Sequence, residues 1–208
     1  MKKRTTVLII LATLLFMTNG VAQMQIGPKA GLNIANFVGD DANFFGIDLE
    51  SRTGFTGGIF FMFQFSSLFA IQPEAYYTMK GATLSGENSD ITFSFDYIEV
   101  PVLLKLIIPV GGSNIRPSVF AGPSVGFNTT AKIKSESAEQ DIKEDIKSTD
   151  FGLVFGGGIG IMIGKNELGF DIRYILGLSS LDDDTSSNAD DIKNAVISFN
   201  MYFGFSLL

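Results

Sequence analysis

Residues 197–207 read Ile-Ser-Phe-Asn-Met-Tyr-Phe-Gly-Phe-Ser-Leu. Apolar side chains occupy every odd position of this stretch, whereas serine, asparagine, tyrosine or glycine occupies every even one. Because successive side chains of a β-strand point to opposite faces, the stretch predicts a strand with one continuously apolar face. The other face of the same strand is polar, so the two faces must meet different environments.

Seven further stretches of the chain show the same two-residue period. The eight predicted strands cover residues 26–38, 53–65, 68–81, 91–109, 114–129, 150–164, 167–179 and 194–208. Tight turns at 66–67, 110–113 and 165–166 alternate with long polar connections at 39–52, 82–90, 130–149 and 180–193. This alternation is typical of barrels in the outer membrane. The sequence therefore predicts an all-β fold, an eight-stranded antiparallel transmembrane β-barrel built as an up-and-down meander.

The two faces of the predicted strands differ in chemistry. Phenylalanine, isoleucine and leucine gather on one face, while glycine and charge gather on the other. The charged residues predicted to face the lumen are Lys29, Glu74, Lys80, Glu99, Lys105, Arg116, Asp171 and Arg173. An apolar outer surface is favourable only in hydrocarbon, and a closed lumen keeps charged groups paired or hydrated. The alternative is a soluble lipocalin-like barrel with its apolar face inward, which this arrangement disfavours.

The lumenal charges have two interpretations. Charges held in a narrow lumen have strong fields, and such fields suit a binding site. Charges of opposite sign also satisfy one another as the packed polar core of a barrel too thin to carry a channel. We favour the packed core, because eight strands leave an interior that side chains fill.

The first 22 residues have the features of a secretory signal peptide. Basic residues at positions 2–4 precede an apolar run from Val7 to Met17, and Gly20 and Ala22 mark a cleavage site. This predicts a signal peptide over residues 1–22 and an outer-membrane barrel domain over residues 23–208. Both termini should lie in the periplasm, with the long loops outside the cell. The chain has no cysteine, which excludes a lipoprotein anchor, disulfides and thiolate metal sites.

Net charge limits the possible partners. The first 22 residues hold three of the fifteen basic residues and no acidic one, which leaves twelve basic against twenty-two acidic residues and a formal charge of −10. Such a balance argues against nucleic acid as a partner. We expect outer-membrane lipid and lipopolysaccharide as surroundings, envelope or secretion proteins as partners, and a monomeric barrel.

Two strands carry local irregularities. Apolar residues occupy odd positions from Ile91 to Tyr97 but even positions from Ile98 onward. A two-residue period changes phase only by absorbing an extra residue, so the sequence predicts a β-bulge close to Tyr97 and Ile98. Pro73 and Pro101 also fall inside predicted strands, where they cannot donate to the ladder. Either they lie at local irregularities, or these strands are drawn wrongly.

Little in the sequence suggests catalysis. The chain has no histidine, which removes the usual general base of hydrolases and all imidazole metal sites. Residues 156–160 superficially resemble a phosphate-binding loop, but Ile161 stands where the dinucleotide fingerprint needs glycine. We therefore expect no enzyme, no nucleotide site and no cofactor.

Two of the long loops deserve separate interpretation. An acidic cluster in the last loop consists of Asp182, Asp183, Asp184, Asp190 and Asp191. It either binds divalent cations that bridge to lipopolysaccharide phosphates or is a solvated acidic loop, and the lack of an EF-hand register favours the latter. In the loop at 130–149, the spacing of Glu139 and Lys143 and that of Ile142 and Ile146 suggest a short surface helix.

Four segments together resemble one known family. They are Gly27-Pro-Lys-Ala-Gly-Leu-Asn-Ile-Ala, Gln72-Pro-Glu-Ala-Tyr-Tyr-Thr-Met-Lys-Gly, Tyr97-Ile-Glu-Val-Pro-Val-Leu-Leu-Lys and Arg116-Pro-Ser-Val-Phe-Ala-Gly-Pro-Ser. With them the chain resembles the PorT-type outer-membrane β-barrel family of Gram-negative bacteria over nearly its whole mature length. The resemblance implies an eight-stranded outer-membrane barrel without a catalytic motif. The family's namesake takes part in protein secretion, a role that fold alone does not transfer.

The expected function is structural or interactive, and envelope or secretion machinery is the expected contact. Three alternatives stay open at this point: a passive conduit for small solutes, a component of a secretion system, and an enzyme acting on lipid or peptide. Stable conductance steps in liposomes would favour the conduit. Loss of activity on replacing an inward carboxylate such as Glu74 or Asp171 would favour the enzyme.

Overall fold

The computed structural model describes residues 23–39, 49–85, 90–135, 138–180 and 192–207. The predicted signal peptide, residues 1–22, lies outside these ranges. The five aspartates of the predicted acidic loop, Asp182, Asp183, Asp184, Asp190 and Asp191, also lie outside them. No helix in the described ranges has the length and apolar character needed to cross a bilayer.

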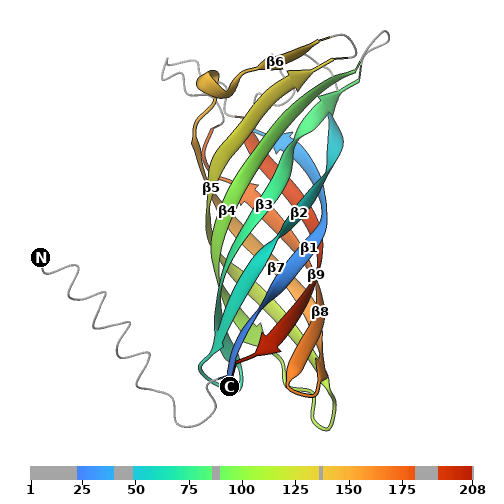
Figure 1. Cartoon of the computed structure of the whole chain (residues 1–208), viewed down its shortest axis with the longest axis vertical. Helices are drawn as coiled ribbons and strands as arrows, with labels where there is room; N and C mark the ends of the chain where they lie inside the picture. Colours follow the sequence, from blue (N-terminus) through green and yellow to red (C-terminus); the bar gives the residue numbers. More distant parts are fainter. Residues whose placement is uncertain (1–22, 40–48, 86–89, 136–137, 181–191, 208) are drawn as a thin grey trace, which may run out of the picture.

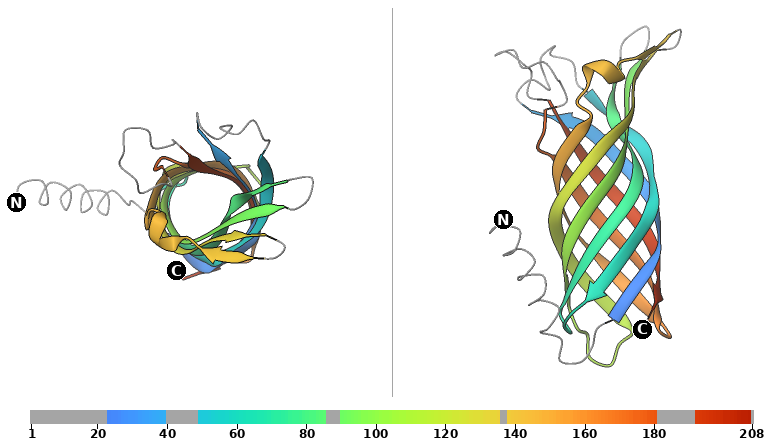
Figure 2. Two further views of the ribbon diagram at one scale, coloured as in Figure 1. Left: turned by 90° about the horizontal axis from the view of Figure 1, so that it is seen from above. Right: turned by 60° about the vertical axis from the view of Figure 1, so that its left-hand side comes forward.

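Eight antiparallel strands form a closed ring. They are β1 (Gln23–Val38), β2 (Leu49–Gln64), β3 (Phe69–Leu84), β4 (Ile91–Ile107), β5 (Ile115–Lys134), β7 (Thr149–Ile163), β8 (Asn166–Gly177) and β9 (Lys193–Ser206). Each strand pairs with the next along the chain, β9 pairs with β1, and β4 pairs with β5, so no edge remains open. Figure 1 shows the strongly tilted strands, and Figure 2 shows the ring from above. The predicted eight-stranded meander is confirmed.

The short connections all lie at one end of the barrel (Figure 1). Residues 65–68 join β2 to β3, residues 108–114 join β4 to β5, and residues 164–165 join β7 to β8. In the second and third turns Gly112 and Gly164 adopt φ values of +71° and +65°, which favour glycine. The start of β1 lies at the same end, because Gln23 pairs with Gln64, the last residue of β2 before the first turn. We call this the turn end, and the opposite end the outer end.

The outer surface of the ring is apolar and the inner surface is largely polar. Exposed large hydrophobics alternate along every strand, and Met201, Ile59 and Phe151 are each more than half exposed. Charged and amide side chains at the alternate positions are almost completely buried. Water would disfavour such an outer surface, whereas hydrocarbon favours it.

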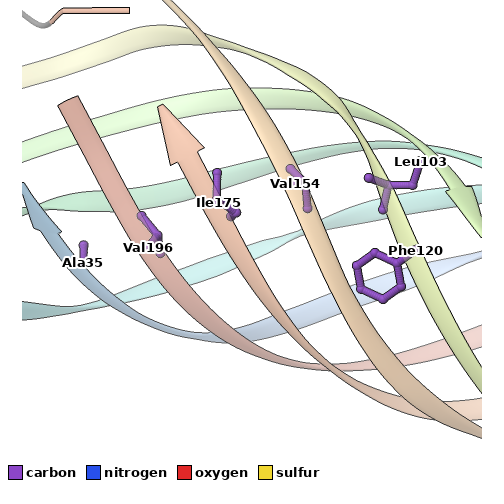
Figure 3. Packing of buried hydrophobic residues seen from close by; sticks show 6 residues of the cluster. All are labelled: Ala35, Leu103, Phe120, Val154, Ile175 and Val196. Carbon is purple, nitrogen blue, oxygen red and sulfur yellow. The ribbon is translucent and has the colours of Figure 1, made fainter. Parts of the chain in front are cut away.

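Apolar side chains also fill part of the lumen, which the sequence analysis did not anticipate. One cluster joins six residues from six strands, drawn in Figure 3: Ala35, Leu103, Phe120, Val154, Ile175 and Val196. A second cluster lies closer to the turn end and contains Phe60, Met62, Ala70, Ile107 and Tyr202. The interior is therefore packed with both ion pairs and hydrocarbon.

The predicted irregularity occurs at the expected height but on the neighbouring strand. The pairing of β4 with β5 shifts between Asp96 and Tyr97, and the residue left without a partner is Thr129 of β5. β4 itself keeps its phase, so Phe93 and Phe95 lie on the inner side rather than facing lipid. An irregularity at this height is confirmed, but the prediction that β4 carries the bulge and changes phase is wrong. These apolar residues fill the outer end of the lumen. In the sequence, their alternation is the same as that of residues that face lipid.

The predicted strands that contain Pro73 and Pro101 are present in the structure as β3 and β4. The register of β3 against β4 is the same on both sides of these residues, from Pro73 opposite Val102 to Tyr76 opposite Glu99. The ladder has no pairs between these two positions. The prolines therefore lie at a local gap in the hydrogen bonding, because proline cannot donate to a ladder.

At the outer end the chain extends beyond the ring. Strand β6 (Glu139–Asp141) pairs with the last residues of β5, and the short 3-10 helix η1 (Lys143–Asp145) follows it. Both lie at the top of Figure 1. The predicted surface helix is thus reduced to a single turn, while Ile142 and Ile146 both pack against buried residues as their shared spacing suggested. Glu139 bonds to Lys132 instead of Lys143.

Candidate functional site

The inner surface of the barrel is the candidate site. All eight charged residues predicted to face the lumen are on it, and all but Arg116 are buried to at least 95%. Their ion pairs fall into separate groups, which form three layers along the barrel axis. Lys105 joins two of these layers, because its ammonium donates to Gln72 and to the Tyr202 hydroxyl.

The middle layer brings four predicted residues together. Lys29 Nζ lies 2.7 Å from Glu74 Oε1 and 3.0 Å from Asp171 Oδ2. Arg173 donates to both carboxylates, with its Nη1 2.7 Å from Glu74 Oε2 and its Nε 3.0 Å from Asp171 Oδ1. Two cations thus face two anions. Because the side chains of all four are buried, the pairing offsets the cost of removing each charge from water.

The contact between Glu74 and Arg173 crosses the lumen. Glu74 lies on β3 and Arg173 on β8, and these strands are four places apart in a ring of eight. Their side chains nevertheless meet at 2.7 Å. Amides extend the layer, since Gln72 donates to Glu74 at 2.7 Å and Asn200 donates to Asp171 at 3.0 Å. The centre of the barrel is therefore closed by direct side-chain contacts.

The outer layer holds two more predicted residues. Lys80 Nζ lies 2.8 Å from Glu99 Oε2 and 3.6 Å from Asp150 Oδ2. Asn194 donates to the same Asp150 oxygen at 3.0 Å. The Lys80 ammonium also lies 4.9 Å from the centroid of the Tyr97 ring, where the ring face attracts a cation.

The turn-end layer holds the remaining two predicted residues. Arg116 Nη1 lies 3.1 Å from Glu167 Oε2, and its Nη2 donates to Gln64 at 2.5 Å. Tyr202 donates to Glu167 at 2.7 Å. Lys105 makes no ion pair with any described residue. Its ammonium lies 3.4 Å from Gln72 Oε1 and 5.2 Å from the Tyr202 ring centroid.

Two anionic partners were missed by the sequence analysis. Asp150 and Glu167 are 5% and 2% exposed and complete the outer and turn-end layers. Each is an even number of positions away from inward-facing residues of its own strand. Glu167, for example, is four residues before Asp171 on β8. Both lie at the ends of strands, and the two-residue period continued to those ends places them on the inner face.

Glycines on the inner side of β7 make room for these layers. A Cβ atom on Gly156 would lie 2.9 Å from the Phe120 ring, and one on Gly160 would lie 2.2 Å from Glu167 Oε1. The glycine run at 156–160 is therefore part of a strand, as its continuing strand pattern suggested. Its function is to admit the larger side chains of neighbouring strands.

An aromatic cap lies above the outer layer. Phe37 packs against Phe93 and Phe95 with ring centroids 6.3 Å and 5.8 Å away, and Tyr97 and Ala131 complete the buried group. Phe37 lies on β1 and the other two rings on β4, three places apart in the ring. The outer mouth is thus covered by rings from separate strands. At the turn end, by contrast, a pocket of about 350 Å³ opens beside Arg116, Ile107 and Met162.

Comparison with known proteins identifies the family to which this barrel belongs. The family model described as outer membrane protein beta-barrel domain matches residues 18–183. The chain belongs to this family. As a member of the outer membrane protein beta-barrel domain family, the protein is an outer-membrane β-barrel, which agrees with its apolar outer surface. No curated protein sequence matches the chain.

Two solved structures share the fold. The outer membrane protein OprG from Pseudomonas aeruginosa is 15% identical, with 92% of this chain and 98% of that chain covered and a TM-score of 0.55. The Neisserial surface protein A, NspA, is 13% identical, with 86% of this chain and 97% of that chain covered and a TM-score of 0.51. At these identities the likeness extends to the fold and not to the residues of the lumen.

Proposed function

We propose that this protein is a non-conducting structural and interaction component of the outer membrane, monomeric and surrounded by lipid and lipopolysaccharide. The observation that carries the proposal is the contact between Glu74 and Arg173, which joins opposite strands across the centre of the lumen at 2.7 Å. Lys80 and Asp150 also meet across the ring at 3.6 Å, and the aromatic cap covers the outer mouth. A hydrated solute has no room between side chains in direct contact.

Conductance in planar bilayers tests this proposal. The purified barrel should give no stable single-channel steps, while an outer-membrane porin inserted in the same way does. The paired variant Glu74→Ala/Arg173→Ala removes the contact across the lumen, so conductance that appears only in this variant locates the barrier there. Stable steps from the unmodified protein would show that it is a conduit.

The proposal excludes catalysis as the main role. Its support is chemical: the chain has no histidine and no cysteine, and the carboxylates of the middle layer are occupied by Lys29 and Arg173. A carboxylate held in two ion pairs is a poor general base, because its lone pairs are already engaged. Hydrolysis of lipid or peptide substrates by the purified barrel, abolished by Glu74→Gln at unchanged stability, would contradict this.

The outer extension is the recognition surface that we propose. Glu139, Gln140 and Asp141 are exposed on a strand that pairs outside the ring, so they are presented without being needed for closure. A photo-crosslinking residue at Gln140 in intact cells should capture a partner, and the matched position Gly111 in a turn-end connection should not. Capture from Gly111 alone would move the interaction to the other end of the barrel.

A role with secretion machinery is the more specific form of this proposal. The four segments that resemble the PorT-type family support it, and three of them supply the lumenal residues Lys29, Glu74 and Glu99. Deletion of the protein should then trap exported cargo in the periplasm. A deletion strain with normal surface export would limit the role to envelope structure.

A further inference from the structure

Six buried polar residues lie together at the base of the aromatic cap, with Tyr97 belonging to both groups. They come from five strands and each is at most 8% exposed. We call this group the outer chamber, and its members are Lys80, Tyr97, Glu99, Asn128, Asp150 and Asn194. The proposed non-conducting role uses only the contact between Lys80 and Asp150, so the remaining polar groups of the chamber need a separate explanation.

Strand pairing leaves a gap between the two carboxylates of the outer chamber. Glu99 pairs with Gly126, and Gly126 pairs with Asp150, so the three residues form one row on the inner surface with no side chain in its middle. A Cβ atom built on Gly126 would come no closer than 3.3 Å to any side chain, the nearest atom being Cδ1 of Tyr97. A Cβ atom on Gly177 would meet Asn194 O at 3.0 Å and Asp150 Oδ1 at 3.3 Å, so this second glycine is closely bounded. Gly126 therefore leaves no side chain between the two carboxylates.

Five oxygen atoms of the chamber have no hydrogen-bond donor among the described residues. They are Tyr97 Oη, Glu99 Oε1, Asn128 Oδ1, Asp150 Oδ1 and Asn194 Oδ1. The amide nitrogens are engaged, since Asn194 donates to Asp150 at 3.0 Å and Asn128 donates to the carbonyl oxygen of Thr130 at 3.3 Å. Buried acceptors without a donor are unfavourable, and the Tyr97 hydroxyl can donate to only one of the other four oxygens. The group therefore indicates a ligand that takes oxygen contacts.

The charge of the chamber indicates the sign and valence of that ligand. One cation, Lys80, faces two anions, Glu99 and Asp150, so the chamber carries one surplus negative charge. The unpaired lumenal cation, Lys105, is six residues further along β4 from Glu99, about 20 Å at the rise of a strand. In surroundings of low dielectric constant, a surplus charge attracts a counter-ion.

We propose that the outer chamber binds one monovalent alkali cation. A single positive charge neutralises the chamber, and carboxylate, amide and phenol oxygens are the hard ligands that such a cation takes. A divalent ion fits less well, because no described group of three or more acidic, histidine or cysteine side chains is placed to hold one. Calcium in particular takes six to eight oxygen ligands, and Lys80 would repel it. The bound cation joins β4, β5, β7 and β9 beneath the cap.

Thermal unfolding of the full barrel in detergent tests the proposal. At equal ionic strength, sodium chloride should raise the Tm above its value in choline chloride by about 3–5 °C once sodium exceeds its dissociation constant about tenfold. The effect should saturate and should vanish in Asp150→Asn. The matched control Glu139→Gln, which removes a carboxylate outside the ring, should retain it. Equal Tm values in sodium and choline for the unmodified protein would overturn the proposal, since water or a proton would then satisfy the chamber.

A direct measurement covers the case in which Asp150→Asn does not fold. Crystals of the unmodified barrel soaked in a thallous salt, with Tl⁺ as the probe, should show an anomalous peak bounded by Asn128, Asp150 and Asn194. Replacing the soak with choline should abolish the peak. Anomalous density confined to the protein surface would contradict a site in the chamber.

Discussion

At the residue scale, the stability of the lumen depends on coupled charges rather than on single pairs. Arg173 contacts Glu74 and Asp171, and Lys29 contacts the same two carboxylates. Removing one member leaves its partners buried with an uncompensated charge, which costs more than the pair contributes. This asymmetry explains why such residues are a structural requirement even though an ion pair by itself is a weak source of stability.

The middle layer makes a direct prediction. Arg173→Met should lower the free energy of unfolding by about 3–5 kcal/mol, because Glu74 and Asp171 then share only Lys29. Urea unfolding of the barrel in lipid vesicles, followed by circular dichroism, measures the change. The control Lys134→Met removes a half-exposed cation and should leave the midpoint unchanged. Equal midpoints for the two variants would show that the four charges are not coupled.

At the element scale, β7 shows how glycine position determines strand packing. Gly158 lies on the inner side, where an added Cβ atom would meet Phe170 O at 2.6 Å and Asp171 Cβ at 2.9 Å. The adjacent Gly157 lies on the outer side, and its nearest contact would be 3.3 Å from Ser118 O. The two glycines are adjacent on β7, so substitutions at these two positions form a matched pair.

Alanine should therefore have different effects at these two neighbours. Gly158→Ala should destabilise the barrel by about 1–3 kcal/mol, because backbone and a buried carboxylate must move. Gly157→Ala should be close to neutral. The folded fraction of each variant is measured by its shift in electrophoretic mobility between unboiled and boiled samples. A larger loss for Gly157→Ala would contradict the assignment of inner and outer faces in β7.

The hairpin of β5 and β6 predicts a response to pH. Lys132 Nζ lies 2.5 Å from Glu139 Oε1, and this hydrogen bond and charge lower the pKa of Glu139 below its ordinary value. Because the pKa is lower in the folded state, the contribution to stability is present above the ordinary glutamate pKa and is lost as the pH falls through the lowered one. The pair is exposed, so the contribution is small and screened by salt.

Hydrogen exchange should detect this loss. The amide of Ser135, which donates to Ala138 O at 2.8 Å, should lose protection in acid after correction for intrinsic rates. In Glu139→Gln its protection should be the same at both ends of the pH range. Protection in the unmodified protein that does not change in acid would show that the ion pair does not hold the hairpin.

At the scale of the whole molecule, lipid determines which face points outward. Met201 is 63% exposed, and the outer surface around it is formed by the other apolar residues of β9 and its neighbours. Toward the outer end, Tyr77 donates to Asp96 at 2.6 Å on the outer surface. Tyrosine and charge at this height are typical of a membrane–water boundary.

A charge placed in the apolar band should be costly. Met201→Lys should destabilise the barrel by about 2–4 kcal/mol in vesicles if the residue lies near the bilayer midplane. Gln140→Lys, an equal gain of charge on the exposed β6, should have little effect. Unfolding midpoints of both variants in the same lipid measure the difference. Equal stability of Met201→Lys and the unmodified barrel would mean that lipid does not surround this face.

The sequence by itself determined the strands, their turns and the two faces, because a two-residue period is a local property that each strand shows without its neighbours. It placed Lys29, Glu74 and Arg173 on the inner face for the same reason. Which of these residues meet was decided only by the tertiary structure, since ring closure and strand register bring β3 opposite β8.

The same reason explains the one error in strand phase. An apolar residue at the outer mouth, such as Phe95, has the same pattern whether it faces lipid or the aromatic cap. Only the pairing of β4 with β3 and β5 distinguishes the two, and it assigns the extra residue to Thr129. Local periodicity determines that successive side chains lie on opposite faces of a strand. Closure of the barrel determines which residues each side chain contacts.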